Sequence, residues 1–527
     1  MKLTISWCAR ALLIVLLFAS CKQEGRKENL IGYYQLQGQL VKVTSVQDTL
    51  DVPWEIKYDN GSIWYSLQKG EIWRTDPETG NTHKVLSVPN VFRLRTMGAL
   101  GMAVDHKADS INVYLVYNQR TDTSKLDSTV LVTKLVRYTW DAQKDSLVQP
   151  TILLQWMANT GHNGSRVLIG NNNDLYVTTG DISGFMVAQD LSKLNGKVLR
   201  IMKDGTVPVD NPFPNSLVWS YGHRNQQGIC FGENGLLYAS EHGDALEDEV
   251  NLIEPSLNYG WPVVEGKLDM PEEIHKVDSL KLTVTDPMIS WTPTIAPAAI
   301  TYYGKGPIKE FQNSLLLVTL KGSALYVIHL DETGKRVTGH DIYFKNTWGR
   351  LRSICVDDKG QVYIGTSNRD WNPSAGYPKP GDDHILKIIA TDATGIDKAV
   401  IKEAHTKPEV ATGDKGKEIF LNYCSSCHKA GGEGLAGNFP PLKDNPTLKN
   451  SEKLVSILTH GRSGDQNIMG QTYSQSMPGF SFLTDEQMLD LLNFMKTQLV
   501  KDKPIYLAEL KELRKNAKIQ IQPKAKS

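Results

Sequence analysis

Two cysteines and a histidine lie close together in the segment Cys424-Ser425-Ser426-Cys427-His428. This C-x-x-C-H order is the attachment sequence of a c-type haem, in which each thiol bonds to one haem vinyl group. The imidazole of His428 would bind the iron from one side. A zinc site would need two further ligands at similar spacing, and the sequence has no second C-x-x-C pair. The segment therefore predicts haem c, bound covalently through Cys424 and Cys427, and a role in electron transfer.

Two methionines could provide the second iron ligand. A thioether opposite the histidine raises the haem potential and suits electron transfer. Met469 lies in a Gly-rich stretch, whereas Met477 lies in Ser476-Met477-Pro478, just before a predicted helix. The second segment resembles the Met-Pro axial-ligand segment of class I cytochromes c. We therefore expect Met477 to bind the haem iron and Met469 to be a packing or loop residue.

A second group of chemically capable residues lies in the first 370 positions. Its members are His162 and the pair Arg224-Asn225 in Gly-flanked turns, Lys321 after a predicted strand, and Arg350 and Arg352. Arg350 and Arg352 are two residues apart, so an extended segment would place them on the same side. A ring of cations on one face would suit a small polyanion. Each residue alone also fits an ordinary structural histidine or a solvated arginine.

A repeated pattern predicts the scaffold for these residues. A turn followed by a short β-prone strand recurs six times, at residues 60–65, 110–115, 173–177, 234–238, 313–318 and 359–364. Such runs, bounded by Gly, Asn and Asp, are typical of strands. Six units predict a mainly β fold, a six-bladed β-propeller over residues 40–392.

The pattern becomes helical near the C-terminus. Residues 393–411 are polar and read as a linker. Thr484-Asp485-Glu486-Gln487 is a capping box that opens an amphipathic helix. We expect an all-α domain over residues 412–500 that is similar to a small class I cytochrome c. Residues 501–527 form a basic tail, with a short helix around 505–516 and a charge that faces solvent.

The N-terminus predicts export. Residues 1–21 carry Lys2, Arg10 and an apolar run at 11–18 that is too short for an ordinary membrane span. The following Phe18-Ala19-Ser20-Cys21 resembles a bacterial lipobox, with Cys21 as the lipidated residue. A simple secretory signal cleaved nearby is the alternative. The expected location is periplasmic or cell-surface, anchored to a membrane by lipid, which fits haem attachment outside the cytoplasm.

The net charge bears on the class of partner, and two of the remaining cysteines bear on disulfide formation. The formal net charge is +0, which gives no reason to expect nucleic acid as a partner. Cys230 and Cys355 occupy matching positions in two non-adjacent repeats. Equivalent positions in separate repeats are too far apart to bridge, so we expect two small buried hydrophobic residues.

The predicted propeller resembles the soluble glucose/aldose dehydrogenases that depend on pyrroloquinoline quinone (PQQ), also called the glucose/sorbosone dehydrogenase family. Matching segments follow in order along the chain: Pro53-Trp54, 162–181, 196–200, 222–225, 258–262, 295–297 and 350–352, with a looser match at 210–212. The resemblance implies a propeller that binds PQQ and Ca²⁺ and oxidises an aldose-type sugar at C1 to a lactone.

The resemblance also implies roles for single residues. His162 matches the catalytic base, and Arg224 and Asn225 match residues that contact the quinone oxygens, where negative charge develops. The matching cationic contacts to the cofactor are Lys321, Arg350 and Arg352. The matching calcium turn offers the backbone carbonyls of Gly243 and Asp244. The acidic run after this turn is either a solvated loop or part of a second, structural calcium site with Asp248 and Tyr259.

Two positions depart from the family pattern. Gly161 stands where an Asp commonly precedes the base, and Thr96 begins a segment where the family has Gln or Glu. Both positions belong to the family's substrate pocket. The resemblance therefore does not imply a preference for glucose.

These features predict a sugar dehydrogenase that passes electrons from PQQ to the haem of its own chain. A downstream acceptor, such as another cytochrome or a respiratory oxidase, would then take them. The alternative is a non-catalytic propeller binding module joined to an electron-carrier cytochrome, which has no reason to keep the cationic set. A calcium-dependent sugar-lactone hydrolase is a third reading, and it would not need a haem.

Overall fold

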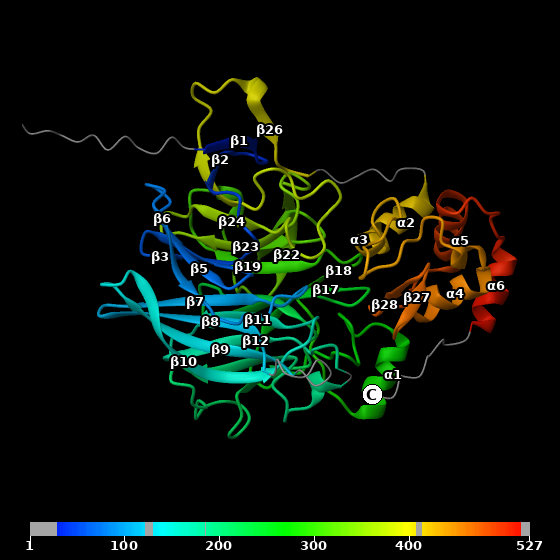
Figure 1. Cartoon of the computed structure of the whole chain (residues 1–527), viewed down its shortest axis with the longest axis horizontal. Coiled ribbons are helices and arrows are strands. Elements are labelled where there is room, and N and C mark those ends of the chain that lie inside the picture. The colour runs from blue at the N-terminus through cyan, green and yellow to red at the C-terminus, as the bar shows by residue number, and fades with distance from the viewer. Residues whose placement is uncertain (1–28, 122–129, 185, 407–413, 518–527) are drawn as a thin grey trace, which may run out of the picture.

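The computed structural model describes residues 29–121, 130–184, 186–406 and 414–517 (Figure 1). The predicted export signal and Cys21 lie outside these residues. In this part of the chain no helix is long and apolar enough to cross a bilayer. The described residues form a large β domain and a smaller helical domain beside it (Figure 1).

Five blades of the β domain are four-stranded antiparallel sheets whose strands follow one another in chain order. The first two are β3 Pro53–Asp59, β4 Ser62–Leu67, β5 Glu71–Thr75 and β6 Thr82–Ser87, then β7 Ala99–Lys107, β8 Ser110–Arg120, β9 Leu131–Asp141 and β10 Ser146–Met157. The third is β11 Gly164–Ile169, β12 Asp174–Thr179, β13 Lys197–Met202 and β14 Val218–Tyr221. The fourth is β15 Gln226–Phe231, β16 Leu237–Glu241, β17 Asp248–Ile253 and β18 Ile289–Trp291, and the fifth is β19 Pro297–Tyr303, β20 Ser314–Thr319, β21 Leu325–Leu330 and β22 Val337–Tyr343.

The sixth blade joins the two ends of the domain. Its strand order is β23-β24-β25-β2-β1-β26, with β2 antiparallel to β25. The bounds are β23 Leu351–Val356, β24 Val362–Thr366, β25 Ile385–Thr391, β2 Leu40–Gln47, β1 Asn29–Gln35 and β26 Ile401–Glu403. The first strands of successive blades contact one another around a closed ring, from β3 through β7, β11, β15, β19 and β23 back to β3. The predicted six-bladed propeller is confirmed.

The six predicted repeats are the second strands of the six blades: β4, β8, β12, β16, β20 and β24. Several of them, such as β12 and β20, are buried along their whole length because neighbouring blades cover both faces. Cys230 and Cys355 lie in the first strands of the fourth and sixth blades, and both are buried free thiols. The prediction that they do not form a disulfide is confirmed.

The segment predicted as a linker is partly bound to the propeller. The strand β26 pairs in parallel with β1, and the amide of Phe344 donates to the carbonyl of Ala404 over 2.8 Å. This strand has three residues, too few for an alternating pattern to show in the sequence. The propeller therefore extends from residue 29 to residue 406, and residues 407–413 lie outside the described part.

The helical domain contains the predicted capping box. The Thr484 hydroxyl accepts from the amide of Gln487, and the Gln487 side chain accepts from the amide of Thr484. This domain consists of α2 Lys415–Tyr423, α3 Ser425–His428, η4 Pro446–Lys449, α4 Ser451–His460, β27 Gln466–Ile468, β28 Gln471–Tyr473, α5 Asp485–Phe494, the π-helical turn η5 Met495–Leu499 and α6 Leu507–Asn516. The other helical segments are α1 Pro271–Leu280 and the turns η1 Val187–Gln189, η2 Lys309–Phe311 and η3 Lys398–Val400.

The last helix belongs to the helical domain and not to a solvated tail. In α6, Leu510 is 0% exposed and packs into the domain core. Arg514 forms an ion pair with Asp485 of α5 at 2.7 Å. Leu507, Leu510 and Leu513 recur every three residues, which gives this short helix an apolar stripe despite its many charges. In the structure, α6 therefore packs onto the helical domain beyond residue 500.

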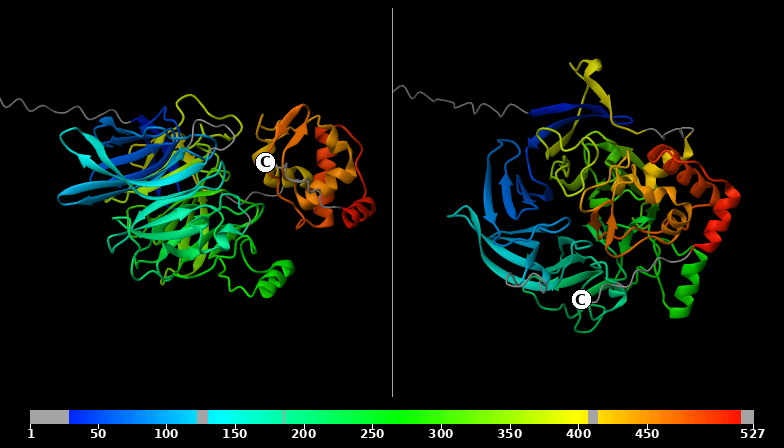
Figure 2. Two further views of the ribbon diagram at one scale, coloured as in Figure 1. Left: turned by 60° about the horizontal axis from the view of Figure 1, so that its bottom comes forward. Right: turned by 45° about the vertical axis from the view of Figure 1, so that its right-hand side comes forward.

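The helical domain lies beside the propeller in Figure 1 and in the left view of Figure 2, and in front of it in the right view of Figure 2. Ala245, between β16 and β17, packs against the core of the helical domain. The ring of Trp371, which follows β24, lies 5.7 Å from the ring of Phe439. The two domains therefore meet at loops that follow the second strands of blades.

Candidate functional site

A cavity of about 440 Å³ lies between the propeller and the helical domain. Its lining includes both groups of residues singled out in the sequence. From the propeller come His162, Arg224, Asn225, Gly243, Asp244, Asp248, Lys321, Arg350 and Arg352. From the helical domain come Cys424, Cys427, His428 and Met477.

His162 is oriented by a carboxylate that the sequence reasoning missed. Its Nδ1 lies 2.7 Å from Oδ1 of Asp181, which follows β12. The indole of Trp261 donates to the other Asp181 oxygen over 2.7 Å, and the amide of Ser183 donates to Oδ1 over 2.8 Å. Asp181 thus provides a carboxylate from 19 residues further along the chain, whereas the residue directly before His162 is Gly161.

The electrostatics keep Asp181 ionised. Its side chain is 3% exposed, and this burial raises its pKa. The hydrogen bond and charge of His162, together with the charge of Arg224, outweigh burial and bring the pKa below its ordinary value. The one sequence signal for this residue was its place at the end of a matching segment, shortly after the strand predicted at residues 173–177.

Arg224 keeps an unused donor in the cavity wall. Its Nη2 is paired with Asp244 Oδ1 at 2.6 Å, and its Nη1 donates to the carbonyl of His242 over 3.3 Å. The Nε atom is buried and has no hydrogen-bond partner among the described residues. The guanidinium also lies 5.1 Å from the ring centre of Trp261. A buried donor of this kind fits a ligand oxygen.

A buried network fixes the backbone beneath Arg224. Glu241 accepts from the amide of Arg224 and lies 3.0 Å from Nδ1 of His223. The ring of His223 stacks on Tyr259 at 4.6 Å. Burial raises the pKa of Glu241 to about 8. These groups hold the turn that presents Arg224 and Asn225.

Arg350 and Arg352 lie on the same side of their segment, as predicted. Both guanidiniums bond to Oδ2 of Asp370, at 2.9 and 3.1 Å. Lys321 donates to Thr294 over 2.9 Å, and burial lowers the pKa of its amine. Two carboxylates, Asp370 beside the guanidiniums and Asp248 near Lys321, face two guanidiniums and an ammonium, so this wall keeps an excess of positive charge. Asp370 was not predicted, because nothing local distinguishes it from other acidic turn residues.

The turn after β16 directs two neighbouring backbone carbonyls, those of Gly243 and Asp244, away from the Glu265 carboxylate. The amides of Asp244 and Ala245 both donate to Oε1 of Glu265. In a trans peptide the carbonyl points away from the following N–H. The carbonyls of Gly243 and Asp244 therefore both point away from Glu265. Backbone carbonyls presented together are suitable calcium ligands.

The structure does not bring Asp248 and Tyr259 together as a second calcium site. Asp248 accepts from the backbone amides of Gly243, Ile295 and Ala296. The Tyr259 hydroxyl donates to the carbonyl of Leu252. Leu252 is four residues beyond Asp248 on β17, so at ordinary strand rise their Cα atoms are roughly 13 Å apart. Within the described ranges, no group of three or more His, Cys, Asp or Glu side chains could hold a metal ion.

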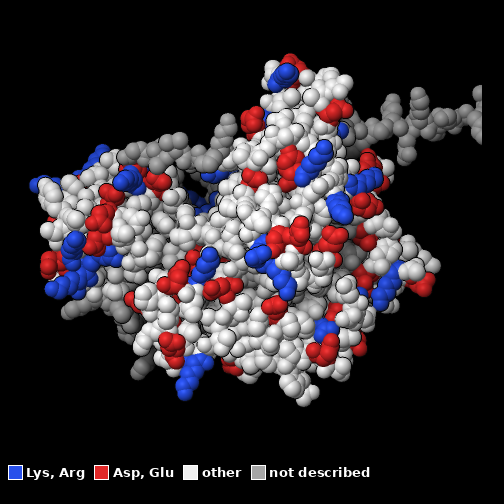
Figure 3. Space-filling model, turned by 180° about the vertical axis from the view of Figure 1, so that it is seen from behind, with Lys and Arg blue, Asp and Glu red and all other residues white. Residues whose placement is uncertain are grey.

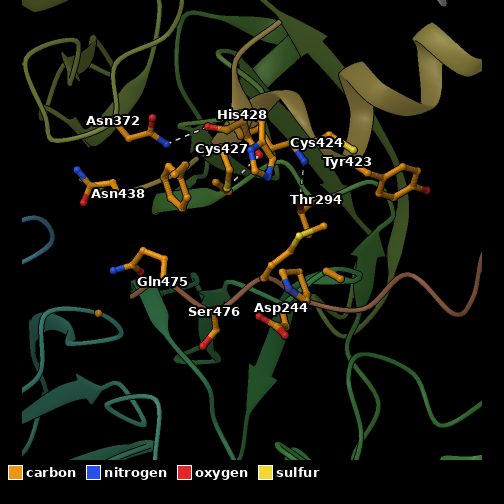
Figure 4. A pocket seen from close by; sticks show the side chains of 18 of the residues that line it. Asp244, Thr294, Asn372, Tyr423, Cys424, Cys427, His428, Asn438, Gln475 and Ser476 are labelled. Atoms are coloured by element: carbon orange, nitrogen blue, oxygen red, sulfur yellow. Dashed lines mark hydrogen bonds between the residues drawn. The ribbon is translucent and has the colours of Figure 1, made fainter. Parts of the chain in front are cut away.

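The haem ligands lie in an arrangement that fits the group. Nδ1 of His428 bonds to the carbonyl of Pro440 over 2.8 Å, which leaves Nε2 for the iron. Cys424, Cys427 and His428 lie on one side of the cavity, opposite Gln475 and Ser476, the residues before Met477 (Figure 4). Apolar residues line the space between them: Leu448, Leu454, Ile457, Leu458, Phe480 and Met495.

The two candidate methionines lie in different environments, one in the cavity wall and the other in an exposed turn. Met477 lines the cavity and is held by paired backbone bonds to Arg462, each of 2.8 Å. Met469 is 57% exposed in the turn between β27 and β28. The geometry supports Met477 as the iron ligand and makes Met469 a loop residue.

Comparisons with known proteins agree with this geometry. The Glucose / Sorbosone dehydrogenase family model matches residues 50–372, and the Cytochrome c model matches residues 413–498. The chain is 26% identical over 340 residues to Aldose sugar dehydrogenase YliI of Escherichia coli (strain K12), covering 62% of this chain and 90% of the relative. It is 28% identical over 412 residues to Quinoprotein glucose dehydrogenase B of Acinetobacter calcoaceticus, covering 63% and 84%.

A solved structure adds a comparison in three dimensions. The PQQ-bound form of Aldose Sugar Dehydrogenase from Streptomyces coelicolor is 30% identical, with a TM-score of 0.56, and the match covers 67% of this chain and 98% of that one. The family model covers more than half of the 527 residues. The chain therefore belongs to the glucose/sorbosone dehydrogenase family, with a cytochrome c domain joined to its propeller.

Proposed function

We propose that this protein oxidises the C1 hydroxyl of an aldose-type sugar to a lactone, using PQQ and Ca²⁺, and passes the electrons to its own c-type haem. One observation carries the proposal. The cations of the propeller line the same cavity as Cys424, Cys427, His428 and Met477, the four residues expected to hold the haem. A propeller that only bound a ligand would not need a haem site in that wall.

The residues present fit PQQ, which is a tricarboxylate. Lys321, Arg350 and Arg352 would bind its carboxylates, and the free Nε of Arg224 together with Asn225 would bind its quinone oxygens. The carbonyls of Gly243 and Asp244 would bind the calcium ion. When bound, PQQ supplies a quinone carbonyl that accepts a hydride from the sugar.

His162 would act as the general base. Asp181 would accept a hydrogen bond from Nδ1–H, which keeps that proton on the ring and leaves the lone pair of Nε2 to take the proton of the C1 hydroxyl. Arg224 places positive charge where the quinone oxygen gains negative charge, which favours the transition state over the ground state. His162 would therefore take the proton, and Arg224 would stabilise the negative charge on the quinone oxygen.

The test is reduction of the haem by sugar. The protein is loaded with haem, PQQ and Ca²⁺, and a panel of aldoses is added while the haem absorbance is followed. We expect at least one aldose to reduce the haem, and the His162→Ala variant, with PQQ still bound, to lose this reduction. A protein that binds PQQ but is reduced by no sugar would contradict the proposal.

The second iron ligand has its own test. Met477→Ala removes a thioether, which stabilises the reduced iron, so the haem midpoint potential should fall by roughly a hundred millivolts or more. Met469→Ala is the matched control because that side chain lies in an exposed turn. Redox titration of both variants measures the difference, and an equal potential in the two variants would exclude Met477.

We also propose that the chain is exported and anchored by lipid at Cys21, which lies outside the described residues. Covalent haem attachment fits this location. Cys21→Ala should move the protein from the membrane fraction to the soluble fraction. Fractionation and labelling with a radioactive fatty acid distinguish the anchor from a simple cleaved signal, for which the variant would change nothing.

A further inference from the structure

One short turn of the propeller, residues 372–373, makes three hydrogen bonds to the helical domain. Asn372 follows β24 and lies beside the haem-attachment segment (Figure 4). Its Nδ2 donates to the carbonyl of Ser426 over 3.0 Å. Ser426 lies between the two haem cysteines, so this bond joins the propeller to the covalent haem site itself.

Lys429 completes the contact from the other domain. It directly follows His428, and its Nζ donates to Oδ1 of Asn372 over 2.6 Å and to the carbonyl of Pro373 over 2.9 Å. Both ends of the Asn372 amide are therefore used by the cytochrome domain. The backbone of Lys429 is in the left-handed region, with φ of 65°, which a non-glycine residue keeps where other contacts hold it.

The same turn is bonded to the cationic wall of the propeller. Oδ1 of Asp370 accepts from the amide of Asn372 over 2.9 Å, while its Oδ2 binds Arg350 and Arg352. A continuous path of bonds thus runs from the two guanidiniums through Asp370 and Asn372 to the haem-attachment segment. The position of the haem is thereby linked to the position of the cations.

The outer face shown in Figure 3 carries both basic and acidic side chains on each domain, and the formal net charge of the protein is +0. The hydrogen bonds of Asn372 and Lys429 therefore stand out as a specific short-range contact between the two domains.

We infer that Asn372 and Lys429 form a docking latch, which holds the haem-attachment segment against the cofactor-binding cations so that electrons cross within the docked molecule. The electron-transfer part rests on the proposed function, whereas the docking part does not. Oxidation of one sugar to its lactone releases two electrons and two protons. Reduction of Fe(III) to Fe(II) uses one electron, so a one-electron acceptor outside the chain must reoxidise the haem between the two transfers.

The docking part is tested without PQQ. Asn372→Ala and Lys429→Ala each remove hydrogen bonds of the latch, and Lys417→Ala, on the exposed side of α2, is the matched control. Hydrogen exchange is measured on haem-loaded proteins over residues 371–373 and 425–429. Loss of bonds to a charged group should speed exchange there by about tenfold, with the control unchanged. Exchange at the wild-type rate in both latch variants would overturn the latch.

The electron-transfer part compares two acceptors. With PQQ, Ca²⁺ and sugar, we expect haem reduction per bound haem to slow by about tenfold in both latch variants. The kcat and KM with a small soluble dye, which reaches the cofactor without the cytochrome domain, should stay at the wild-type values. Lys429→Arg keeps the charge and a long donor, so it should restore most of the rate.

The outcomes separate the two proposals. If sugar fails to reduce the haem even in the wild-type protein, the proposed function fails, and the exchange experiment still decides the latch. If the wild-type protein is reduced and both latch variants are reduced equally fast, the latch fails and the proposed function stands.

Discussion

At the scale of single residues, the pairing of His162 with Asp181 decides what the imidazole can do. An imidazole can offer a lone pair at Nε2 only when its proton sits on Nδ1. Asp181 lies where it accepts a hydrogen bond from Nδ1–H, and Trp261 together with the amide of Ser183 holds the carboxylate in place. Three separate segments thus prepare one nitrogen for proton transfer.

The first prediction concerns this pair. Asp181→Asn can present its NH₂ group to Nδ1, which would move the ring proton to Nε2 and remove the base. Dye-linked sugar oxidation should fall about a hundredfold to ten-thousandfold, while PQQ affinity changes little. The control is Asp278→Asn on the exposed face of α1. Activity within a few-fold of wild type in Asp181→Asn would show that His162 does not depend on this carboxylate.

The second prediction concerns Asp370 and pH. Burial raises the pKa of this carboxyl, but Arg350 and Arg352 outweigh burial and hold the pKa below its ordinary value of 3.8. A group whose folded pKa is lowered contributes stability above the unfolded pKa and loses it as pH falls through the folded pKa. Asp370→Asn should therefore cost about 3–5 kcal/mol at pH 7, with a cost that shrinks below about pH 4.

Urea unfolding of Asp370→Asn and wild type between pH 7 and pH 3 measures that difference. Other titrating groups are common to both proteins and cancel. A difference in the free energy of unfolding that is constant over this range would mean that the carboxylate's charge is not what stabilises the wall.

At the scale of elements, some features could be read from the sequence and others could not. Each repeat begins with a turn and continues as a buried β-prone strand, so the second strands were visible locally. The strand β26 was not, because its three residues depend on β1, which lies more than 360 residues away in the chain. Asn372 and Asp370 were missed for the same reason, since their partners come from other elements.

The third prediction tests whether α6 belongs to the cytochrome domain. Leu510→Ala leaves a cavity beneath this helix, because the side chain is fully buried against the domain core. The cytochrome domain should lose about 2–5 kcal/mol of stability. Circular dichroism of the haem band follows its unfolding. Glu509→Ala, on the exposed side of the same helix, should stay within about 0.5 kcal/mol of wild type.

At the scale of the whole molecule, one chain carries both the proposed electron-donor site and the proposed acceptor site. A domain joined to its partner meets it at an effective concentration in the millimolar range. The direct contacts at Asn372 and Ala245 add a preferred orientation to this proximity. Electron transfer inside the chain should therefore outrun transfer between separate molecules at any ordinary protein concentration.

The last prediction follows from that comparison. Haem reduction by sugar should be first order, with a rate constant unchanged when the protein is diluted a hundredfold, because each molecule reduces its own haem. The control mixes two full-length proteins: His162→Ala, which keeps the haem but lacks the base, and a Cys424→Ala/Cys427→Ala variant, which keeps the propeller site but cannot bind haem covalently. Reduction in the mixture must occur between molecules, so its rate should be slow and proportional to concentration. If the wild-type rate also falls in proportion to dilution, the docked arrangement does not carry the electrons.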